Sequence, residues 1–407
     1  MKQRQARISR RSAPVLSAVH QPEEWRRRAW GYALASFLAL ALLSHLHFVP
    51  FACLKSTPFS EIPSLDTVLE SRWQAAYRRG VFRTTTERSL PKRTIRNGQL
   101  SFSLALNEGR QQKRQTLVTA AAAAADPGDH ENALQLTRPF IEADFHFGKV
   151  DSNEYLFIVD EVADRVRCGP VADLHQHAVL INPFPLGWLS GLLVPYLLEH
   201  RPQVMTRDAL TAGFAFAQRL QNPYTRLAFN SLEAGASVNH LHFQFWQFDA
   251  PLAVELATRQ LYFRFGEELT LHILPDAPVH TLAVEYFRTT ATGAIVVVQR
   301  IIDLLYQHVL PFNLVFSRYY VNAGISPSRS TVYIVLRQRM HPFPGINIGF
   351  PEVSGELICT SSSIYHSVTA HNISQHWRDN VRLSGDRYTE FLGSLKRHLP
   401  TLLSETT

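Results

Sequence analysis

The sequence predicts a protein of mixed helices and strands. Apolar residues recur at helical spacing in some segments, whereas short alternating or continuous apolar runs, of the length typical of strands, mark others. The chain has 407 residues, of which 45% are hydrophobic and 18% are charged. This composition excludes a largely disordered chain and is sufficient for one large core or two modest cores.

The elements expected before residue 140 are few. Apolar residues at helical spacing predict a short helix within Pro58–Arg83. Leu100–Leu106 alternates large apolar with small residues and predicts a strand, and Asn107–Arg110 predicts a turn. An alanine-rich stretch at about residues 116–133 is expected to be a surface insertion rather than a domain boundary.

Strand and helix patterns alternate over residues 155–300 and continue beyond them. A helix is expected from Thr206 to about Leu220, with Thr206 as the N-cap and Asp208 in the first turn. Strands are expected at residues 178–181, 193–195, 226–230, 238–248, 286–288, 313–316 and 331–337.

Basic residues are concentrated at the amino end of the chain. Residues 1–55 contain nine Lys or Arg and two Asp or Glu, whereas the remaining 32 basic and 32 acidic residues cancel. A neutral body argues against a broad nucleic-acid surface, so we expect no nucleic-acid partner. A single phosphate-bearing ligand needs only a few local donors and remains compatible with this charge.

Residues 1–58 form a basic leader that contains a hydrophobic segment. Ala29–Leu54 has none of Asp, Glu, Lys or Arg over 26 residues, which is long enough for a helix to cross a ~30 Å hydrocarbon layer. The segment therefore predicts membrane contact. A buried helix and a long signal peptide are alternatives, and His45, His47 and Pro50 weaken the prediction of a spanning helix.

The most informative segment contains His240, His242 and Gln244. Successive side chains of a strand point to opposite faces, so these three polar side chains would share one face. The other face would carry Leu241, Phe243 and Phe245 into the core. Alone, such a histidine pair is a weak signal, because it could also bind a metal ion or consist of ordinary surface residues.

The same segment resembles the histidine-triad pattern His-φ-His-φ-His/Gln-φ, where φ is an apolar residue. More narrowly, Asn230-Ser231-Leu232 followed by Ser237–His242 resembles the GDP-D-glucose and GDP-L-galactose phosphorylase family. Three further blocks resemble this family in order: Leu-Asn-Glu-Gly-Arg at Leu106–Arg110, a Phe-Asn-Phe-x-Lys block at Phe145–Val150, and Ile-Asn-x-x-Pro at Ile181–Pro185 through Pro195. The resemblance covers about Leu65 to Trp377.

The resemblance implies an α+β, histidine-triad-like fold over residues 59–400, with helices packed on an antiparallel sheet and room for two fused half-modules. Strand spacing alone would not establish this fold. The implied reaction is that of a GDP-hexose phosphorylase, which converts a GDP-hexose such as GDP-D-glucose and inorganic phosphate into hexose 1-phosphate and GDP. The implied partners are a GDP-sugar and phosphate.

The resemblance also implies residue roles. His242 would attack the α-phosphorus and form a guanylyl-histidine, which divides one displacement into two. His240 would orient the site or bond the phosphate, and Gln244, Asn230 and Ser237 would donate to phosphate oxygens. Nucleotide contacts are expected from Asn182, Arg110 and Lys149. For Asn182 the alternative is a turn-forming residue, and for the two cations it is an ordinary solvated side chain.

No metal site and no cofactor are expected. Cys53, Cys168 and Cys359 are too few and too scattered for a zinc site or a disulfide framework. The implied chemistry needs no metal ion.

Two positions depart from the family pattern, since Ser190 and Glu356 stand where the family carries histidine. The change would alter the preferred substrate or acceptor, or it would abolish activity. A catalytically impaired nucleotide-binding or membrane-tethered protein is therefore the alternative function. A carboxylate at position 356 would repel a diphosphate unless it pairs with a cation or binds a sugar hydroxyl.

The implied location is the cytoplasm, with membrane association through residues 29–54. Arg26-Arg27-Arg28 precedes that segment and would place the body in a lumen if the segment spans a bilayer. In that case the sequon Asn372-Ile373-Ser374 would be open to glycosylation.

Overall fold

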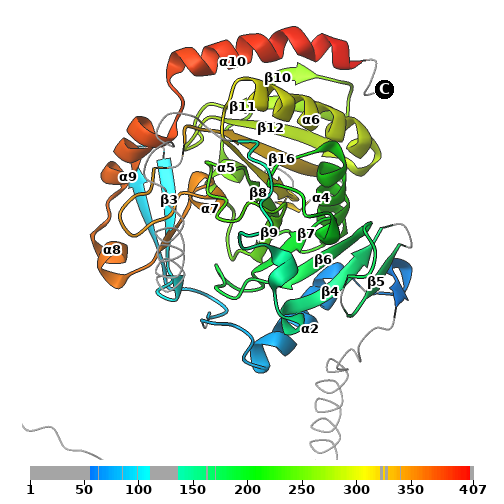
Figure 1. Ribbon diagram of the computed structural model, residues 1–407. Coiled ribbons are helices and arrows are strands. Elements are labelled where there is room, and N and C mark those ends of the chain that lie inside the picture. The colour runs from blue at the N-terminus through cyan, green and yellow to red at the C-terminus, as the bar shows by residue number, and fades with distance from the viewer. Residues whose placement is uncertain are drawn as a thin grey trace, which may run out of the picture. The chain divides into compact units, whose positions relative to one another are not determined.

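The computed structural model describes residues 56–110 and 136–403, apart from residues 63, 85, 99, 162–163, 170, 321–323, 326–328 and 340 (Figure 1). The chain divides into two compact units, Met1–Ala52 and Cys53–Thr407, and all described residues belong to the second. The hydrophobic segment at 29–54 and the insertion expected at 116–133 lie outside the described residues.

A large antiparallel sheet organises the second unit. Its twelve strands have the order β1-β5-β4-β6-β7-β9-β8-β13-β16-β12-β11-β10, and neighbours are antiparallel throughout. Its strands are β1 (Thr57–Pro58), β4 (Tyr155–Asp160), β5 (Arg165–Arg167), β6 (Gln176–Ile181), β7 (Gly191–Val194), β8 (Thr225–Asn230), β9 (Phe243–Gln247), β10 (Gln260–Arg264), β11 (Leu269–Leu274), β12 (Thr281–Phe287), β13 (Phe312–Ser317) and β16 (Arg329–Leu336).

The large sheet consists of two halves with the same strand order. In the first half, β6 and β7 precede a helix, β8 and β9 follow it, and the order in the sheet is β6-β7-β9-β8. In the second half, β11, β12, a helix, β13 and β16 give the order β11-β12-β16-β13. The halves join where β8 pairs with β13, for example at Asn230 opposite Asn313. This is the arrangement expected of two fused half-modules.

Two smaller sheets lie beside the large one. β17 (Glu356–Cys359) runs parallel to β3 (Leu100–Leu106), which pairs with β2 (Lys92–Asn97). β14 (Tyr319–Tyr320) pairs with β15 (Gly324–Ile325).

Helices α4 (Arg207–Arg219) and α6 (Ala291–Gln307) pack on the same face of the large sheet and enclose the main core (Figure 1). The other helices are α2 (Leu65–Arg78), α5 (Ala253–Leu256), α7 (Phe350–Val353), α8 (Ser362–Ser367), α9 (Ala370–His376) and α10 (Gly385–His398). Among the described residues, one stretch, Arg288–Gln307, has the length and apolarity needed to cross a membrane. It contains α6, whose apolar face belongs to the main core, so packing explains its composition.

Most predicted elements are confirmed. The strand predicted at Leu100–Leu106 is β3, and the helix predicted at residues 206–220 is α4. Thr206 occupies the N-cap position, but its side chain accepts no capping bond from a backbone N–H; its hydroxyl donates to Asp208. The helix expected within Pro58–Arg83 is confined to α2, Leu65–Arg78.

The prediction of one strand over residues 238–248 is wrong in its first half. β9 begins only at Phe243 and ends at Gln247, so both histidines precede the strand. The first residues instead bond to partners distant in sequence: the backbone N–H of Leu241 donates to Arg201 O at 2.9 Å, and that of His242 donates to the side chain of Gln203, so neither joins the ladder with β8.

Candidate active site

His240 and His242 lie in the segment that leads from the end of β8 to the beginning of β9, and both are buried. The predicted division of the two faces holds: Leu241, Phe243 and Phe245 all belong to the main core. The apolar side chains therefore fix the segment, and the imidazoles are held by polar contacts.

Gln203 provides the most direct of these contacts. The backbone N–H of His242 donates to Gln203 Oε1 at 2.8 Å. The amide nitrogen Nε2 of Gln203 donates to the carbonyl oxygens of Asn230, at 2.9 Å, and of His242, at 3.1 Å. Gln203 is fully buried, so one side chain replaces the strand ladder at this point and fixes His242 relative to the end of β8.

The tautomer of His242 follows from its hydrogen bond. Its Nδ1 lies 2.8 Å from His240 O, and a carbonyl oxygen only accepts, so Nδ1 carries the proton. In the neutral ring the lone pair is then on Nε2. A nitrogen nucleophile needs such a lone pair, and the backbone of the neighbouring histidine selects which nitrogen has it.

His240 has the opposite tautomer. The backbone N–H of Phe147 donates to His240 Nδ1 at 3.0 Å, so Nε2 carries the proton. Nε2 is buried and has no hydrogen-bond partner within the described part of the chain. Burial, with smaller contributions from the imidazoles of His242, His146 and His200, lowers the pKa of His240 to about 3. His240 is therefore a neutral donor at physiological pH.

Asn230 connects this segment to the second half of the sheet. Its Oδ1 accepts hydrogen bonds from Asn313 Nδ2 at 2.7 Å and from the backbone N–H of Phe350 at 3.1 Å. The side-chain oxygen of Asn230 is thus occupied, and its amide nitrogen is the end that is suited to donate to a ligand.

Two arginines interact with one buried carboxylate close to Asn230. Glu352 accepts the backbone N–H of Gly349 at 2.9 Å, and burial raises its pKa to about 7, although Arg110 acts to lower it. Arg337 is fully buried; it donates through Nη1 to Ile348 O at 2.7 Å, while Nη2 has no partner within the described residues.

Burial also lowers the pKa of both guanidinium groups, that of Arg337 to about 9 and that of Arg110 to about 10, although the Glu352 carboxylate favours their charged forms. One carboxylate thus interacts electrostatically with two cations, the buried Arg337 and the half-buried Arg110. An arrangement of this kind, with excess positive charge, favours an anion.

Two blocks of the family resemblance contact each other. Asn107 Nδ2 donates to the carbonyl oxygens of Pro185, at 3.0 Å, and Leu186, at 3.2 Å. Arg110 Nη1 donates to Phe184 O at 2.7 Å. The turn after β3 therefore packs on the turn between β6 and β7, which places the Arg110 guanidinium in the interior.

The remaining predicted residues have varied surroundings. Gln244 is half-buried on β9, between Leu192 of β7 and Ala228 of β8, and Ser237 is exposed. Asn182 is buried, and its Oδ1 accepts the backbone N–H of Phe184 at 3.1 Å, which is the turn-forming contact considered above.

Lys149 makes structural contacts. Its ammonium group donates to the carbonyl oxygens of Glu142, Ala143 and Asp144 at 2.6, 3.3 and 2.7 Å. These three bonds use the three N–H donors of the lysine, and they order the loop at residues 142–144.

The two positions that lack the family histidine are both buried. The hydroxyl of Ser190 accepts the backbone N–H of Leu186 at 3.1 Å, and its carbonyl accepts the indole N–H of Trp73 at 2.9 Å. Lys92 Nζ lies 3.0 Å from both carboxylate oxygens of Glu356 and also contacts Asp249. Burial raises the pKa of Glu356, and Lys92 opposes that shift.

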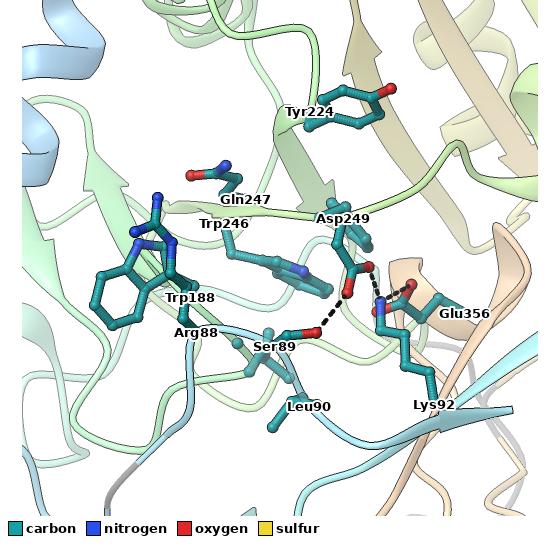
Figure 2. A pocket seen from close by; sticks show the side chains of 13 residues that line it. Arg88, Ser89, Leu90, Lys92, Trp188, Tyr224, Trp246, Gln247, Asp249 and Glu356 are labelled. Carbon is teal, nitrogen blue, oxygen red and sulfur yellow. Dashed lines mark hydrogen bonds and ion pairs between the residues drawn. The ribbon is translucent and has the colours of Figure 1, made fainter. Parts of the chain in front are cut away.

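Glu356 lines a cavity of about 380 Å³ (Figure 2). The indoles of Trp188 and Trp246 line it as well, together with Lys92 and Asp249. Trp246 is two residues after Gln244 on β9, so the cavity adjoins the strand that follows the histidine pair, but neither histidine lines it. A cavity lined by aromatic rings and by charged side chains suits a sugar or a base.

Sequence reasoning missed Gln203, Arg337 and Glu352 as members of the site. An isolated glutamine or arginine has no spacing signal, and the three positions are far from the histidine pair in the sequence. Pro202-Gln203, directly before α4, offers no pattern that distinguishes a buried bridging amide from a loop residue.

The fold is that of a known nucleotide phosphorylase. The yeast Ap4A phosphorylase Apa2, solved in complex with Ap4A, superimposes with a TM-score of 0.51 at 13% identity, covering 79% of this chain and 98% of that one. The likeness confirms the predicted α+β fold with a large antiparallel sheet. At this sequence identity it is evidence for the fold and not for the activity.

Family models place the chain more narrowly. Residues 64–246 match the model described as GDPGP1-like, N-terminal domain, and residues 253–399 match GDPGP1-like, C-terminal domain. Together the matches cover most of the chain, so the chain belongs to the GDPGP1-like family of GDP-D-glucose and GDP-L-galactose phosphorylases, as the resemblance predicted. Their boundary, between residues 246 and 253, falls between the two halves of the sheet.

Relatives with assigned activities are moderately similar. GDP-L-galactose phosphorylase 2 of Arabidopsis thaliana is 28% identical over 266 residues, which is 63% of this chain and 58% of the relative. The match to GDP-L-galactose phosphorylase 1 of the same plant covers 48% of that protein, so the chain spans about half the length of these plant relatives. Human GDP-D-glucose phosphorylase 1 is 29% identical over 319 residues, 75% of this chain and 76% of the relative.

Proposed function

We propose that this protein is a GDP-hexose phosphorylase, with GDP-D-glucose as the first substrate to test. The observation that carries the proposal is the tautomer of His242: its Nδ1–H donates to His240 O, which leaves the lone pair on Nε2. A neutral imidazole held in this way is prepared for nucleophilic attack without prior loss of a proton.

The proposed reaction has two displacements. His242 Nε2 forms a bond to the α-phosphorus of the GDP-sugar, and the bond to the bridging oxygen breaks, so hexose 1-phosphate leaves with the electron pair. An oxygen of inorganic phosphate then attacks the guanylyl-histidine, the P–N bond breaks, and GDP is released with His242 restored. Each step transfers the guanylyl group once, so atoms and charges balance.

The surrounding groups have distinct proposed roles. The amide nitrogens of Asn230 and Gln244, the hydroxyl of Ser237 and the Nε2–H of His240 would donate to phosphate oxygens. Arg337 and Arg110 would supply the charge that a diphosphate requires. Donors aimed at developing charge are each worth roughly 10²–10³ in rate.

Asn182 would contact the ribose through its amide nitrogen, because its side-chain oxygen already accepts the backbone N–H of Phe184 in the turn. Lys149 would have to exchange one of its bonds to carbonyl oxygens for a bond to the nucleotide, since those oxygens occupy its ammonium group. The cavity lined by Trp188, Trp246 and Glu356 is proposed to bind the part of the substrate beyond the reacting phosphorus.

The test is turnover by the full-length chain of GDP-D-glucose, GDP-mannose and GDP-L-galactose, with and without inorganic phosphate. We expect phosphate-dependent release of hexose 1-phosphate and GDP from at least one of them. Release of GMP instead, without any need for phosphate, would make water the acceptor. Tight GDP-sugar binding without turnover of any sugar would refute the proposal and support the alternative, a catalytically impaired nucleotide-binding protein.

We also propose a cytoplasmic body with membrane contact through residues 29–54. Fractionation of cells that express the chain with and without residues 1–58 tests the contact, and recovery of the full-length chain in the soluble fraction would contradict it. A glycosidase-sensitive mass shift that Asn372→Gln abolishes would instead place the body in a lumen.

A further inference from the structure

Three side chains with metal-ligating atoms converge beside the histidine pair. Glu142, His146 and His200 each offer one ligand atom, and these atoms lie within 4.8 Å of one another. Glu142 Oε1 lies 3.1 Å from His146 Nε2, and Glu142 Oε2 lies 2.9 Å from His200 Nδ1. The three residues come from two loops, one before the short helix Phe147–Lys149 and one after the short helix Leu197–Glu199.

The spacing is close to that of a metal centre. Two ligands of a tetrahedral zinc ion, at ~2.0–2.2 Å from the metal, lie roughly 3.3–3.5 Å apart. The observed separations of 3.1 and 2.9 Å are slightly shorter, as expected when hydrogen bonds take the place of an ion. All three ligand atoms lie within 4.8 Å of one another, so rotation of the exposed Glu142 side chain together with small shifts of the imidazoles would admit an ion.

The cluster has an apolar side and an open side. The ring of Phe140 contacts the rings of His146, His200 and His240 at centroid distances of 5.2–5.4 Å. The side chain of His146 is 4% exposed, whereas those of Glu142 and His200 are 66% and 34% exposed. A metal ion could enter from solvent, and water could complete its coordination, while the aromatic ring fixes the inner ligand.

The inner ligand is chemically suited to the role. Metal binding requires a neutral imidazole, and His146 Nε2 already faces Glu142 Oε1 at 3.1 Å. His146 Nδ1 accepts the backbone N–H of Gly148 at 3.2 Å. Coordination through Nε2 would place a proton on Nδ1 and release that long hydrogen bond, which sets a modest cost on binding.

Gly148 is tightly enclosed by the cluster. A Cβ at this position would lie 3.0 Å from His146 Nδ1 and 3.3 Å from His200 Nε2. Glycine therefore allows the two imidazoles to approach the same point.

We propose that Glu142, His146 and His200 bind one divalent transition-metal ion of the zinc type, with water as a further ligand. His146 stands where the Phe-Asn-Phe-x-Lys block of the resemblance has asparagine. At this ligand position the chain therefore departs from that block.

The ion would position the histidine pair without contacting substrate. It would fix residues 142–147 against His240, since the backbone N–H of Phe147 donates to His240 Nδ1. The carbonyl of His240 in turn accepts from His242 Nδ1. Metal binding itself does not depend on GDP-sugar turnover, so the two proposals can fail separately.

The experiment is a titration of the metal-free, full-length chain with Zn²⁺ against a chromophoric chelator, together with visible spectra of the Co²⁺ complex. We expect one equivalent of Zn²⁺ and the intense bands of four-coordinate Co²⁺. Replacement of a ligand, by Glu142→Gln, His146→Asn or His200→Asn, should weaken Zn²⁺ binding at least tenfold and abolish the Co²⁺ bands.

The matched control is His308→Asn. His308 Nδ1 also lies near a glutamate, 3.9 Å from Glu390 Oε1, but it is not part of a three-ligand cluster among the described residues. This variant should bind Zn²⁺ as the parent does.

Two of the variants distinguish a loss of metal binding from a loss of folding. His146→Asn introduces the residue of the family block, which can also serve as the N-cap of the helix Phe147–Lys149, and Glu142 is exposed. Both variants should melt like the metal-free parent, and added Zn²⁺ should raise the melting temperature of the parent alone. Failure of the parent to bind Zn²⁺, or undiminished binding by all three variants, would overturn the proposal.

Discussion

The two halves of the large sheet have the same strand order but differ where the last strand of each half begins. In the first half, β9 has five residues, and the segment before it leaves the ladder to bond with Gln203. In the second half, β16 has eight residues and pairs along its length with β12 and β13. The histidine pair lies in the first half, where the ladder is interrupted. The second half keeps its ladder bonds and packs beside the first.

The two halves also differ in the residues that they carry at equivalent positions of β9 and β16. Gln244 pairs with Ala228, the fourth residue of β8, and Tyr333 pairs with Val315, the fourth residue of β13. Tyr333 is buried and accepts a hydrogen bond from Arg259 at 2.6 Å, so the second half has a structural contact where the first has a candidate phosphate donor.

Buried arginines show the same contrast. Arg226 and Glu255 form a fully buried pair with two hydrogen bonds, of 2.9 and 2.6 Å, in which one cation matches one carboxylate. Arg337 and the half-buried Arg110 share the influence of one carboxylate, Glu352. Arg226 Nη1 and Arg337 Nη2 both lack a partner among the described residues, so the difference lies in the charges: the first arrangement is balanced, whereas the second has more cations than carboxylates and favours an added anion.

The largest expected effect is the loss of turnover on removal of the nucleophile. His242→Ala should lower kcat/KM for the GDP-sugar by roughly 10⁴-fold or more, because no other group can form the covalent intermediate. Thr331→Ala, at the equivalent position two residues before Tyr333, should leave kcat/KM within a few-fold of the parent. Comparable losses in both variants would show that the halves do not differ as described.

The phosphate donors should have the next largest effect. Asn230→Ala, Ser237→Ala and Gln244→Ala should each lower kcat/KM by about ten- to a thousandfold while thermal melts stay close to the parent's. Tyr333→Phe, the second-half counterpart of the change at Gln244, should alter stability rather than kcat/KM. Unchanged kinetics in all three alanine variants would remove the phosphate role.

The pH dependence of stability should report the burial of His240. Its pKa is about 3 in the folded protein and ~6.5 in the unfolded chain, so the unfolded chain takes up the proton between those values. The contribution of neutral His240 to the free energy of unfolding is present above pH ~6.5 and is lost as the pH falls, by up to ~1.4 kcal/mol per unit.

The measurement compares denaturant unfolding of the parent and His240→Asn at pH 7.5, 6 and 5. Glu352, whose pKa of about 7 lies above its unfolded value, stabilises the folded state as the pH falls through the same range, so the parent alone would not isolate the effect. The difference in stability between parent and variant should shrink with falling pH. A constant difference would mean that His240 is not buried as a neutral ring.

The smallest effect is expected at the cavity. Glu356→His introduces the residue of the family pattern and removes one of the two carboxylate partners of Lys92. It should change the ranking of GDP-glucose, GDP-mannose and GDP-L-galactose by a few-fold. Competition assays with pairs of sugars measure the ranking. An unaltered ranking of sugars and acceptors would place this position outside the specificity determinants.

Much of the fold could be predicted from the sequence because its elements carry local patterns. The strand at Leu100–Leu106 has a period of two and flanking turn residues, and α4 has a helical apolar face. The pairing of β8 with β13 could not be predicted, because residues some 80 positions apart must meet and no local pattern records it. The short extent of β9 was missed for the same reason: Gln203 and Arg201, which draw its first residues out of the ladder, are distant in sequence.

Part of the site was also visible in the sequence. The alternation around His242 identified which side chains enter the core, and this was correct. Roles that depend on how loops close in the folded chain were not visible. No pattern around Lys149 showed that the carbonyl oxygens of residues 142–144 would occupy its ammonium group, and nothing near Arg337 showed its burial beside Glu352. The metal-ligand cluster shares this property, since His200 and Glu142 meet only in the folded chain.

The central claim is that His242 Nε2 forms a covalent bond to the guanylyl phosphorus. The most direct measurement is incubation of the full-length protein with guanine-labelled GDP-glucose in the absence of phosphate, followed by quantification of acid-labile label on the protein. We expect label on the parent, partial label on His240→Ala, none on His242→Ala, and release of labelled GDP when phosphate is added. Retention of both label and turnover by His242→Ala would contradict it.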